Sequence, residues 1–227
     1  MTFYTVDYFQ KRKKQLEEIF NIIKPDLQEL ADYFSPRSVN FIARNTRRPL
    51  VKNRKIIDST PLIALRNFSS GMMSGATSPT NRWFKTSFDN VNLANDYYLK
   101  TWCHKQEELT RQILYGSNFY QILPEVYKQL GVFGFSAVGL EADYDNIVNF
   151  KVLPIGSYYY AKNSKGRIDT FCRVYMESAK NLVQNYPNID DIEILEASKN
   201  NPQKLYEVMH FVEENKFYKP KRFLSKY

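Results

Sequence analysis

The pattern of hydrophobic and polar positions changes its period about halfway along the 227-residue chain. Between Asp7 and Phe34, apolar residues recur at intervals of three and four, which is the period of one face of a helix. Pro25 lies inside this segment, so we expect the helix to kink there or to split in two. The apolar positions are Leu16, Ile19, Phe20, Ile23, Leu27, Leu30 and Phe34.

A second helix is predicted from Thr60 to Ala76. Thr60 can cap its first turn, and Pro61 occupies the first helical position, where its missing N–H costs nothing. Leu62, Leu65 and Phe68 or Ser69 then fall on one face, and small residues gather towards its end. Because small residues let another backbone approach closely, we expect this helix to pack within the chain or against a neighbouring chain. The small residues are Ser69, Ser70, Gly71, Ser74 and Gly75.

The segment after this helix breaks at Ser78-Pro79 and then carries the bulky pair Trp83-Phe84. For these two side chains a core position is favoured over a role as interface anchors. Further helices are predicted at residues 91–115 and 118–130. Ser117 is the expected cap of the second of these, Gly131 its expected end and Pro124 a candidate kink. Gly134 is expected to lie close to the start of the first strand.

The second half of the chain reads as strands rich in β-branched and aromatic residues, separated by turn residues. In the connection Asn163-Ser-Lys-Gly166, the glycine can supply a positive φ, as a tight hairpin requires. A short helix at residues 178–185 is ended by Pro187. The fold class is therefore α+β, N-terminal helices packed with a C-terminal antiparallel sheet. We expect a mainly helical part at 1–134 and a β-rich part at 135–227, with one continuous domain as the alternative. The strands are predicted at 135–142, 147–153, 157–162, 168–176 and 205–212.

Composition describes an ordinary globular chain with a basic surplus. Apolar residues make up 43% and charged residues 25%, and the formal net charge is +8. Basic residues cluster at 11–14, 44–54 and 216–226. Such clusters favour contact with a polyanion, the alternative being a solvated surface. Zinc-finger spacing, zipper heptads and RNA-recognition motifs are absent from the sequence, so sequence-specific readout is not expected. No apolar run is long enough to cross a membrane.

The candidate catalytic and metal-binding groups are few. Cys103 and His104 are adjacent, so on a helix they point about 100° apart and cannot act as nucleophile and base. A buried cysteine beside a surface histidine is the favoured interpretation. A zinc site made of these two residues with Cys172 and His210 is the alternative. This set has the right ligand types but lacks the paired short spacing of zinc sites. Glu141, Asp143 and Asp145 favour a solvated acidic turn over a cation loop. The Gly131-Val-Phe-Gly134 run lacks the Lys-Ser/Thr ending of a phosphate loop. We therefore expect no enzyme and no cofactor.

Four segments carry a resemblance in their order and spacing. The first is the run from Ile57 to Phe84, and the second is Ser117-Asn-Phe-Tyr followed by Leu130-Gly-Val-Phe-Gly134. The third is Leu153-Pro-Ile-Gly-Ser-Tyr-Tyr159, and the fourth is Lys165-Gly-Arg-Ile-Asp-Thr170 with Arg173. Together they resemble the head-to-tail connecting (portal) proteins of short-tailed bacteriophages, over residues 9–212. Where relatives often have glycine after the short helix, this chain has Tyr186-Pro187.

The resemblance implies a structural subunit of a portal ring at one capsid vertex, through which double-stranded DNA is packaged and ejected. It implies a portal wing-like fold, a homo-oligomeric ring of about a dozen subunits, and contacts with the capsid, the terminase motor and the tail adaptor. It also implies location in the virion, with assembly in the host cytoplasm. Because family members are usually longer, we expect the stem and clip to be missing and this chain alone to be monomeric or weakly associated.

Electrostatics assigns one group of residues to a candidate surface. A conduit must attract DNA without holding it, so basic residues of the wing belong near packaged DNA or a neighbour's acidic face. The residues expected there are Arg44, Arg47, Arg48, Lys52 and Arg54. The residues expected to have packing roles are Thr60, Pro61, Gly71, Gly75, Pro79, Trp83, Phe84, Gly131, Gly134 and Gly166. The alternative function is a free-standing basic module that binds nucleic acid.

Overall fold

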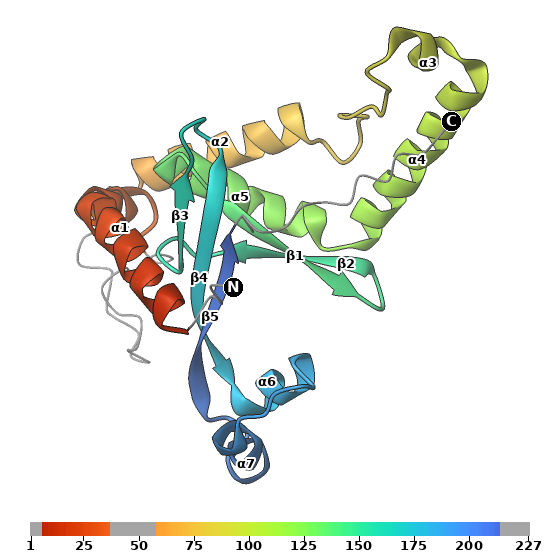
Figure 1. The fold of residues 1–227 in the computed structure, drawn as a ribbon. Coiled ribbons are helices and arrows are strands. Elements are labelled where there is room, and N and C mark those ends of the chain that lie inside the picture. The colour runs from red at the N-terminus through yellow and green to blue at the C-terminus, as the bar shows by residue number, and fades with distance from the viewer. Residues whose placement is uncertain (1–5, 37–57, 214–227) are drawn as a thin grey trace. The chain divides into compact units, whose positions relative to one another are not determined.

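The computed structural model describes residues 6–36 and 58–213 and confirms the α+β class. Contacts divide the chain into two units, residues 23–155 and residues 1–22 with 156–227. The division falls inside helix α1 (Val6–Phe34), which continues through Pro25 and is not split (Figure 1). The expected boundary between residues 134 and 135 stays a prediction. Within the described ranges, no helix is long and apolar enough to cross a membrane.

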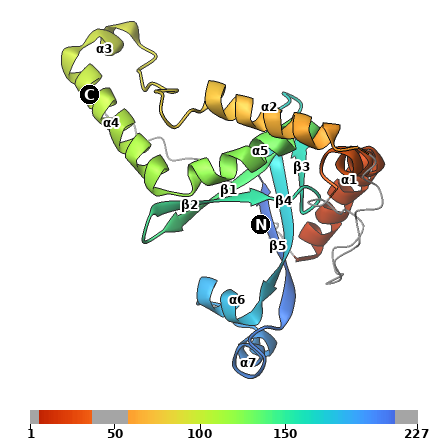
Figure 2. The ribbon, with the colours of Figure 1, turned by 180° about the vertical axis from the view of Figure 1, so that it is seen from behind.

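The unit of residues 23–155 is built around helix α5 (Phe119–Phe133). Helix α2 (Thr60–Ala76) lies along α5, and the hairpin of strands β1 (Ala137–Asp143) and β2 (Ile147–Leu153) packs against α5 through β2 (Figures 1 and 2). Helices α3 (Val91–Asn95) and α4 (Tyr97–Gly116) precede α5.

The other unit holds an antiparallel sheet of order β3-β4-β5. Its strands are β3 (Tyr158–Lys162), β4 (Ile168–Ser178) and β5 (Leu205–Glu213). Leu16 of α1 is buried with Tyr159, Cys172 and Val174 of the sheet. Helices α6 (Ala179–Asn185) and α7 (Ile192–Asn200) lie between β4 and β5. The sequence indicated the start of helix α7 only through Asp190, Asp191 and Glu193, which are typical helix N-terminal charges, and Asp191 is indeed its N-cap.

Two predicted helix boundaries are wrong. The helix expected over 91–115 breaks at Asp96, whose carboxylate accepts the N–H of Leu99 at 3.0 Å and starts α4 as its N-cap. Gly131 does not end α5, which continues to Phe133. Gly134 ends it instead, at φ 76°, a backbone conformation that glycine adopts without steric cost.

The start of α2 also differs from the prediction. Thr60 is the first helical residue and Ser59 occupies the cap position, without a capping hydrogen bond from its side chain. Asp58 takes over this role, because its carboxylate accepts the Thr60 N–H at 3.2 Å. Hydrogen bonds from Thr60 lower the pKa of Asp58, as expected for a carboxylate held in its charged form.

The tyrosines of the three-stranded sheet predict an alkaline loss of stability. Burial raises the pKa of Tyr158 above its usual value of 10.0 and raises that of Tyr175 to about 12. A folded pKa above the unfolded one stabilises the protein fully below about pH 10, and this stability is lost as the pH rises through the folded pKa. The urea midpoint of unfolding should therefore fall between about pH 9 and pH 12. Tyr158→Phe should flatten this fall, and an unchanged pH profile would contradict the assignment.

Candidate interaction surfaces

Of the three basic clusters, only the one at residues 11–14 lies within the described residues. Arg44, Arg47, Arg48, Lys52 and Arg54 lie outside the described residues, as does the cluster at 216–226. The cluster at 11–14 lies on α1, where two of its members are neutralised within their own unit. Lys13 Nζ lies 2.8 Å from Glu207 of β5, and Arg12 Nε lies 3.9 Å from Glu213. This part of α1 therefore offers a polyanion less positive charge than its sequence indicates.

The contact between α2 and α5 gathers several residues that the sequence singled out. Ser69 donates its hydroxyl hydrogen to the carbonyl of Pro124 at 2.8 Å, and the hydroxyls of Thr77 and Tyr127 are 2.7 Å apart. A Cβ atom at Gly131 would lie 2.8 Å from the ring of Phe68, closer than side chains tolerate. A side chain at position 131 would therefore require the ring of Phe68 to shift.

The remaining packing candidates lie elsewhere on α2 and after it. Gly71 and Gly75 are exposed, and no described residue lies within 4 Å of where their Cβ atoms would be. The part of α2 that carries Gly71 and Gly75 is therefore not covered by the described residues, whereas Leu65 and Ser69 are buried. Pro61 lies in the first turn of α2, and Pro79 is half-buried in the segment that follows.

The Gly131 contact can be tested by substitution. Gly131→Val should lower the free energy of unfolding by about 1–3 kcal/mol, because the added side chain overpacks against Phe68. Phe68→Ala should relieve this collision, so the double variant should be more stable than the sum of the single effects implies. Additive effects in urea denaturation would show that the two residues do not meet.

Trp83 and Phe84 belong to a cluster of aromatic rings. The ring centroids of Trp83 and Phe84 are 4.8 Å apart, and Trp83 stacks on Phe119 of α5 at 6.1 Å. The indole Nε1 donates to the hydroxyl of Tyr120 at 3.2 Å. Phe119 in turn contacts Phe150 of β2 at 5.1 Å. Half-buried aromatic side chains therefore join the segment after α2, helix α5 and the hairpin.

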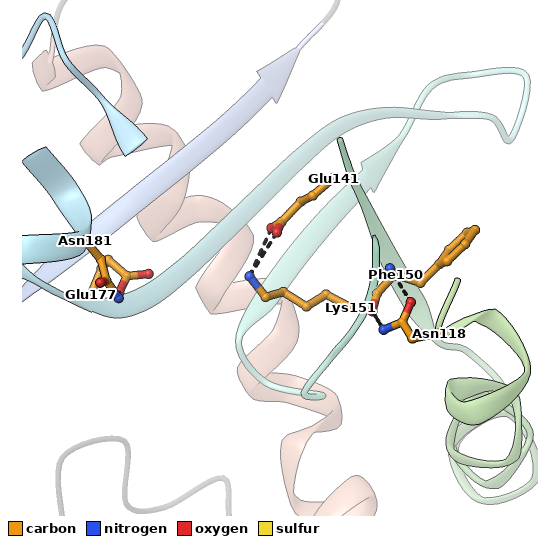
Figure 3. A network of polar contacts seen from close by, with 6 residues as sticks. All are labelled: Asn118, Glu141, Phe150, Lys151, Glu177 and Asn181. Carbon is orange, nitrogen blue, oxygen red and sulfur yellow. Dashed lines mark hydrogen bonds and ion pairs between the residues drawn. The ribbon is translucent and has the colours of Figure 1, made fainter. Parts of the chain in front are cut away.

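Asn118 fixes the hairpin to the start of α5. Its side-chain amide donates to the carbonyl of Phe150 at 2.7 Å, and its side-chain oxygen accepts the N–H of the same residue at 2.8 Å. Figure 3 shows this two-bond contact, with Lys151 on the same strand paired to Glu141 at 3.0 Å. Both bonds serve backbone groups that a neighbouring strand would otherwise satisfy. The sequence had identified Asn118 only as part of a motif.

A pocket of about 210 Å³ lies beside α4, lined by residues 85–88 and by α3 and α4. Cys103, His104 and Glu107 all line it. As the sequence indicated, Cys103 is buried and His104 is exposed. Neither cysteine forms a disulfide bond. Within the described ranges, no three His, Cys, Asp or Glu residues are grouped so that they could hold a metal ion.

The acidic residues at the end of β1 form a solvated turn, as expected. The carboxylate of Asp143 accepts the N–H of Asp145 at 3.1 Å and a bond from the side chain of Asn146. Ile147 follows at φ 70°, with the Val148 N–H bonded to the Asn146 carbonyl at 2.8 Å. A β-branched residue at positive φ is strained, so this turn keeps its shape at some cost in free energy.

Comparison with known proteins identifies the family of this chain. A family model described as bacteriophage head to tail connecting protein matches residues 7–226. The portal protein of Salmonella phage epsilon15 is 34% identical over 158 residues, which are 70% of this chain and 28% of that protein. The probable portal protein of Bordetella phage BPP-1 is 30% identical over 159 residues, 70% of this chain and 29% of that protein.

Both relatives are named as phage portal proteins, one of them as a probable one, and the chain belongs to the bacteriophage head-to-tail connecting protein family. The resemblance inferred from the sequence is confirmed. The matched region spans less than a third of the length of each of these two relatives.

Proposed function

We propose that this chain is the wing portion of a portal subunit in the virion, at the capsid vertex where head and tail meet. The observation that carries the proposal is the family match along residues 7–226, nearly the whole chain. In this role the chain joins a homo-oligomeric ring of about a dozen subunits, assembled in the host cytoplasm. Its partners are the capsid, the terminase motor, the tail adaptor and double-stranded DNA that passes non-specifically. The role is structural, without catalysis.

The described structure supports a load-carrying part more than a reacting one. Helix α5 is joined to α2, to the aromatic cluster and to the hairpin by contacts of both apolar and polar kinds. Contacts of this kind resist deformation, because packed interiors have low compressibility. A ring that transmits force between a motor, a capsid and a tail needs this property.

The position in the particle can be tested directly. Antibody fragments raised against the described residues should label one vertex of each phage head in cryo-electron microscopy. Phage lacking the gene product should accumulate heads without DNA. Labelling spread over all vertices, or no labelling of heads, would overturn the proposal. An antibody against the major capsid protein, which covers the whole head, serves as the control for access.

The alternative function is a free-standing module that binds nucleic acid, favoured by the net charge of +8. The two functions differ in their dependence on salt. A dedicated binder should hold duplex DNA at physiological salt with a steep loss of affinity as salt rises, whereas a ring subunit alone should not. Fluorescence anisotropy with a labelled duplex between about 50 and 200 mM salt distinguishes them.

The basic segment offers a substitution test of the DNA-facing surface. Residues 37–55 are basic and irregular in pattern, which predicts an exposed loop. Replacing Arg44, Arg47, Arg48 and Arg54 together by Gln should therefore leave the unfolding temperature unchanged. It should weaken any salt-sensitive binding of duplex DNA, since each lost phosphate contact reduces the salt dependence. Unchanged DNA binding at low salt would remove this segment from the proposed surface. Replacing Lys180 and Lys199 by Gln gives a control at exposed positions of α6 and α7.

A further inference from the structure

The β1–β2 hairpin has an apolar face that the chain covers only in part. Val138, Leu140 and Ala142 of β1 pair with Val152, Phe150 and Val148 of β2, so these six side chains lie on the same face. On β2, Phe150 packs against Phe119. On β1, Leu140 is 64% exposed and Val138 is 42% exposed. The β1 half of the apolar face is therefore open to a partner.

The outer edge of β1 is open as well. In an antiparallel pair of strands, opposite residues alternate between two kinds. In the first kind the two residues exchange backbone hydrogen bonds, and in the second their N–H and C=O groups point away from the partner strand. Phe150 gives both its backbone groups to Asn118, so it belongs to the second kind. Its partner Leu140 therefore directs its own N–H and C=O away from β2. Among the described strands, β1 pairs with β2 alone. An open edge with exposed apolar side chains is a template for association.

The charge of the hairpin is opposite to that of the chain. Residues 137–153 contain Glu141, Asp143 and Asp145 against the single base Lys151, which gives one minus three, or −2, within a chain of net charge +8. Tyr144 at the tip is fully exposed. A partner for this hairpin should therefore present positive charge beside apolar surface.

The turn between β3 and β4 has those properties. Lys162, Lys165 and Arg167 are exposed, and residues 158–168 contain no acidic residue. Ile168, next to them, is 60% exposed. The turn has a defined shape, because the side-chain oxygen of Asn163 accepts the N–H groups of Lys165 and Arg167 at 2.9 and 3.0 Å. A preorganised surface loses less entropy on binding.

We propose that the acidic β1–β2 hairpin of one copy docks on the basic β3–β4 turn of a second copy of this chain. The inference rests on the proposed function, since a ring is closed by heterologous contacts in which one patch meets a different patch. Leu140, Tyr144 and Ile168 supply apolar contact, and the opposite charges set which patches meet. Two hairpins, or two turns, repel each other, which disfavours a symmetric dimer through either patch.

The contact is tested by exchanging the charges. The first variant is Asp143→Asn with Asp145→Lys, which keeps the side-chain oxygen that accepts the Asp145 N–H. The second variant is Lys165→Glu with Arg167→Glu. Sedimentation velocity at about 100 μM protein and about 20 mM salt should show self-association of the parent that weakens as salt rises. Each variant alone should self-associate about tenfold more weakly. An equimolar mixture should recover association, because each then meets an oppositely charged patch.

Controls and outcomes separate this contact from general charge effects. The matched control variants are Lys180→Glu with Lys199→Glu and Asp190→Lys with Glu196→Lys, at exposed positions that belong to neither patch. They should associate as the parent does. If the first variant unfolds, as circular dichroism would detect, Asp145→Lys alone replaces it.

The contact is overturned if the parent does not self-associate, if the variants associate like the parent, or if the mixture associates no better than either variant alone. If the antibody fragments label one vertex of the phage head and any of these results is found, the proposed function stands and this contact is rejected. Failure of vertex labelling together with restored association in the mixture rejects the portal role and retains the contact.

Discussion

Replacing Asn118 by Ala is expected to lower the free energy of unfolding by about 2–4 kcal/mol. The substitution removes two hydrogen bonds and leaves both backbone groups of Phe150 without their partner in a partly buried place. It should also loosen the hairpin, because β2 is held to α5 through these bonds and the neighbouring ring contact with Phe119. Urea denaturation measures the first effect, and hydrogen exchange of the amides in residues 147–153 measures the second.

Two further variants sharpen this test. Asn200→Ala, at an exposed position at the end of α7, should change stability by less than about 0.5 kcal/mol. Asn118→Asp keeps an acceptor for the Phe150 N–H and loses the donor to its carbonyl at neutral pH. This variant should regain stability as the pH falls, since a protonated acid can donate again. Wild-type exchange rates in the hairpin of the Ala variant would show that Asn118 does not hold it.

Trp83→Ala should destabilise the chain by about 2–4 kcal/mol, somewhat less than for a fully buried tryptophan because the side chain is half-buried. The loss includes stacking on Phe119, the edge contact with Phe84 and the hydrogen bond to Tyr120. Thermal unfolding followed by circular dichroism should show a transition at lower temperature with cooperativity retained.

The controls for Trp83 distinguish packing from assembly. Trp83→Phe keeps a ring in the cluster and should cost less than about 1.5 kcal/mol. Trp102→Ala removes a tryptophan of α4 whose side chain is 51% exposed, so it should cost less than Trp83→Ala. A Trp83→Ala variant that melts like the parent but fails to enter phage heads would make Trp83 an interface residue instead.

The elements that the sequence predicted well are those defined by local pattern. Strand β2 has the predicted bounds, residues 147–153, and Gly166 adopts φ 75° in the predicted turn. Helix α2 likewise occupies its predicted range of residues 60–76. Alternation of side chains, helix periodicity and turn residues are properties of a few neighbouring positions, so no distant contact is needed to recognise them.

The errors arise where two local signals compete. Gly131 and Gly134 can each end a helix, and the chain itself does not rank them. The structure ends the helix at Gly134, which adopts the left-handed conformation, while Gly131 stays helical and exposed, with its Cα facing the ring of Phe68. Similarly, Asp96 can continue a helix or cap one, and the cap is the form that the structure adopts. Local propensity alone does not rank such alternatives.

The sequence by itself determined the α+β class, the hairpin turn and, through four ordered segments, the family to which the chain belongs. Those properties follow from local periodicity and from residue types at fixed spacing. Only the tertiary structure decided that Asn118 satisfies the edge of β2, that Trp83 joins an aromatic cluster and that Glu207 neutralises Lys13. It also decided which apolar faces stay open, since exposure depends on which neighbours the fold brings to each side chain. An apolar residue in a sequence indicates only that its side chain tends to be buried. The fold determines which residue it packs against.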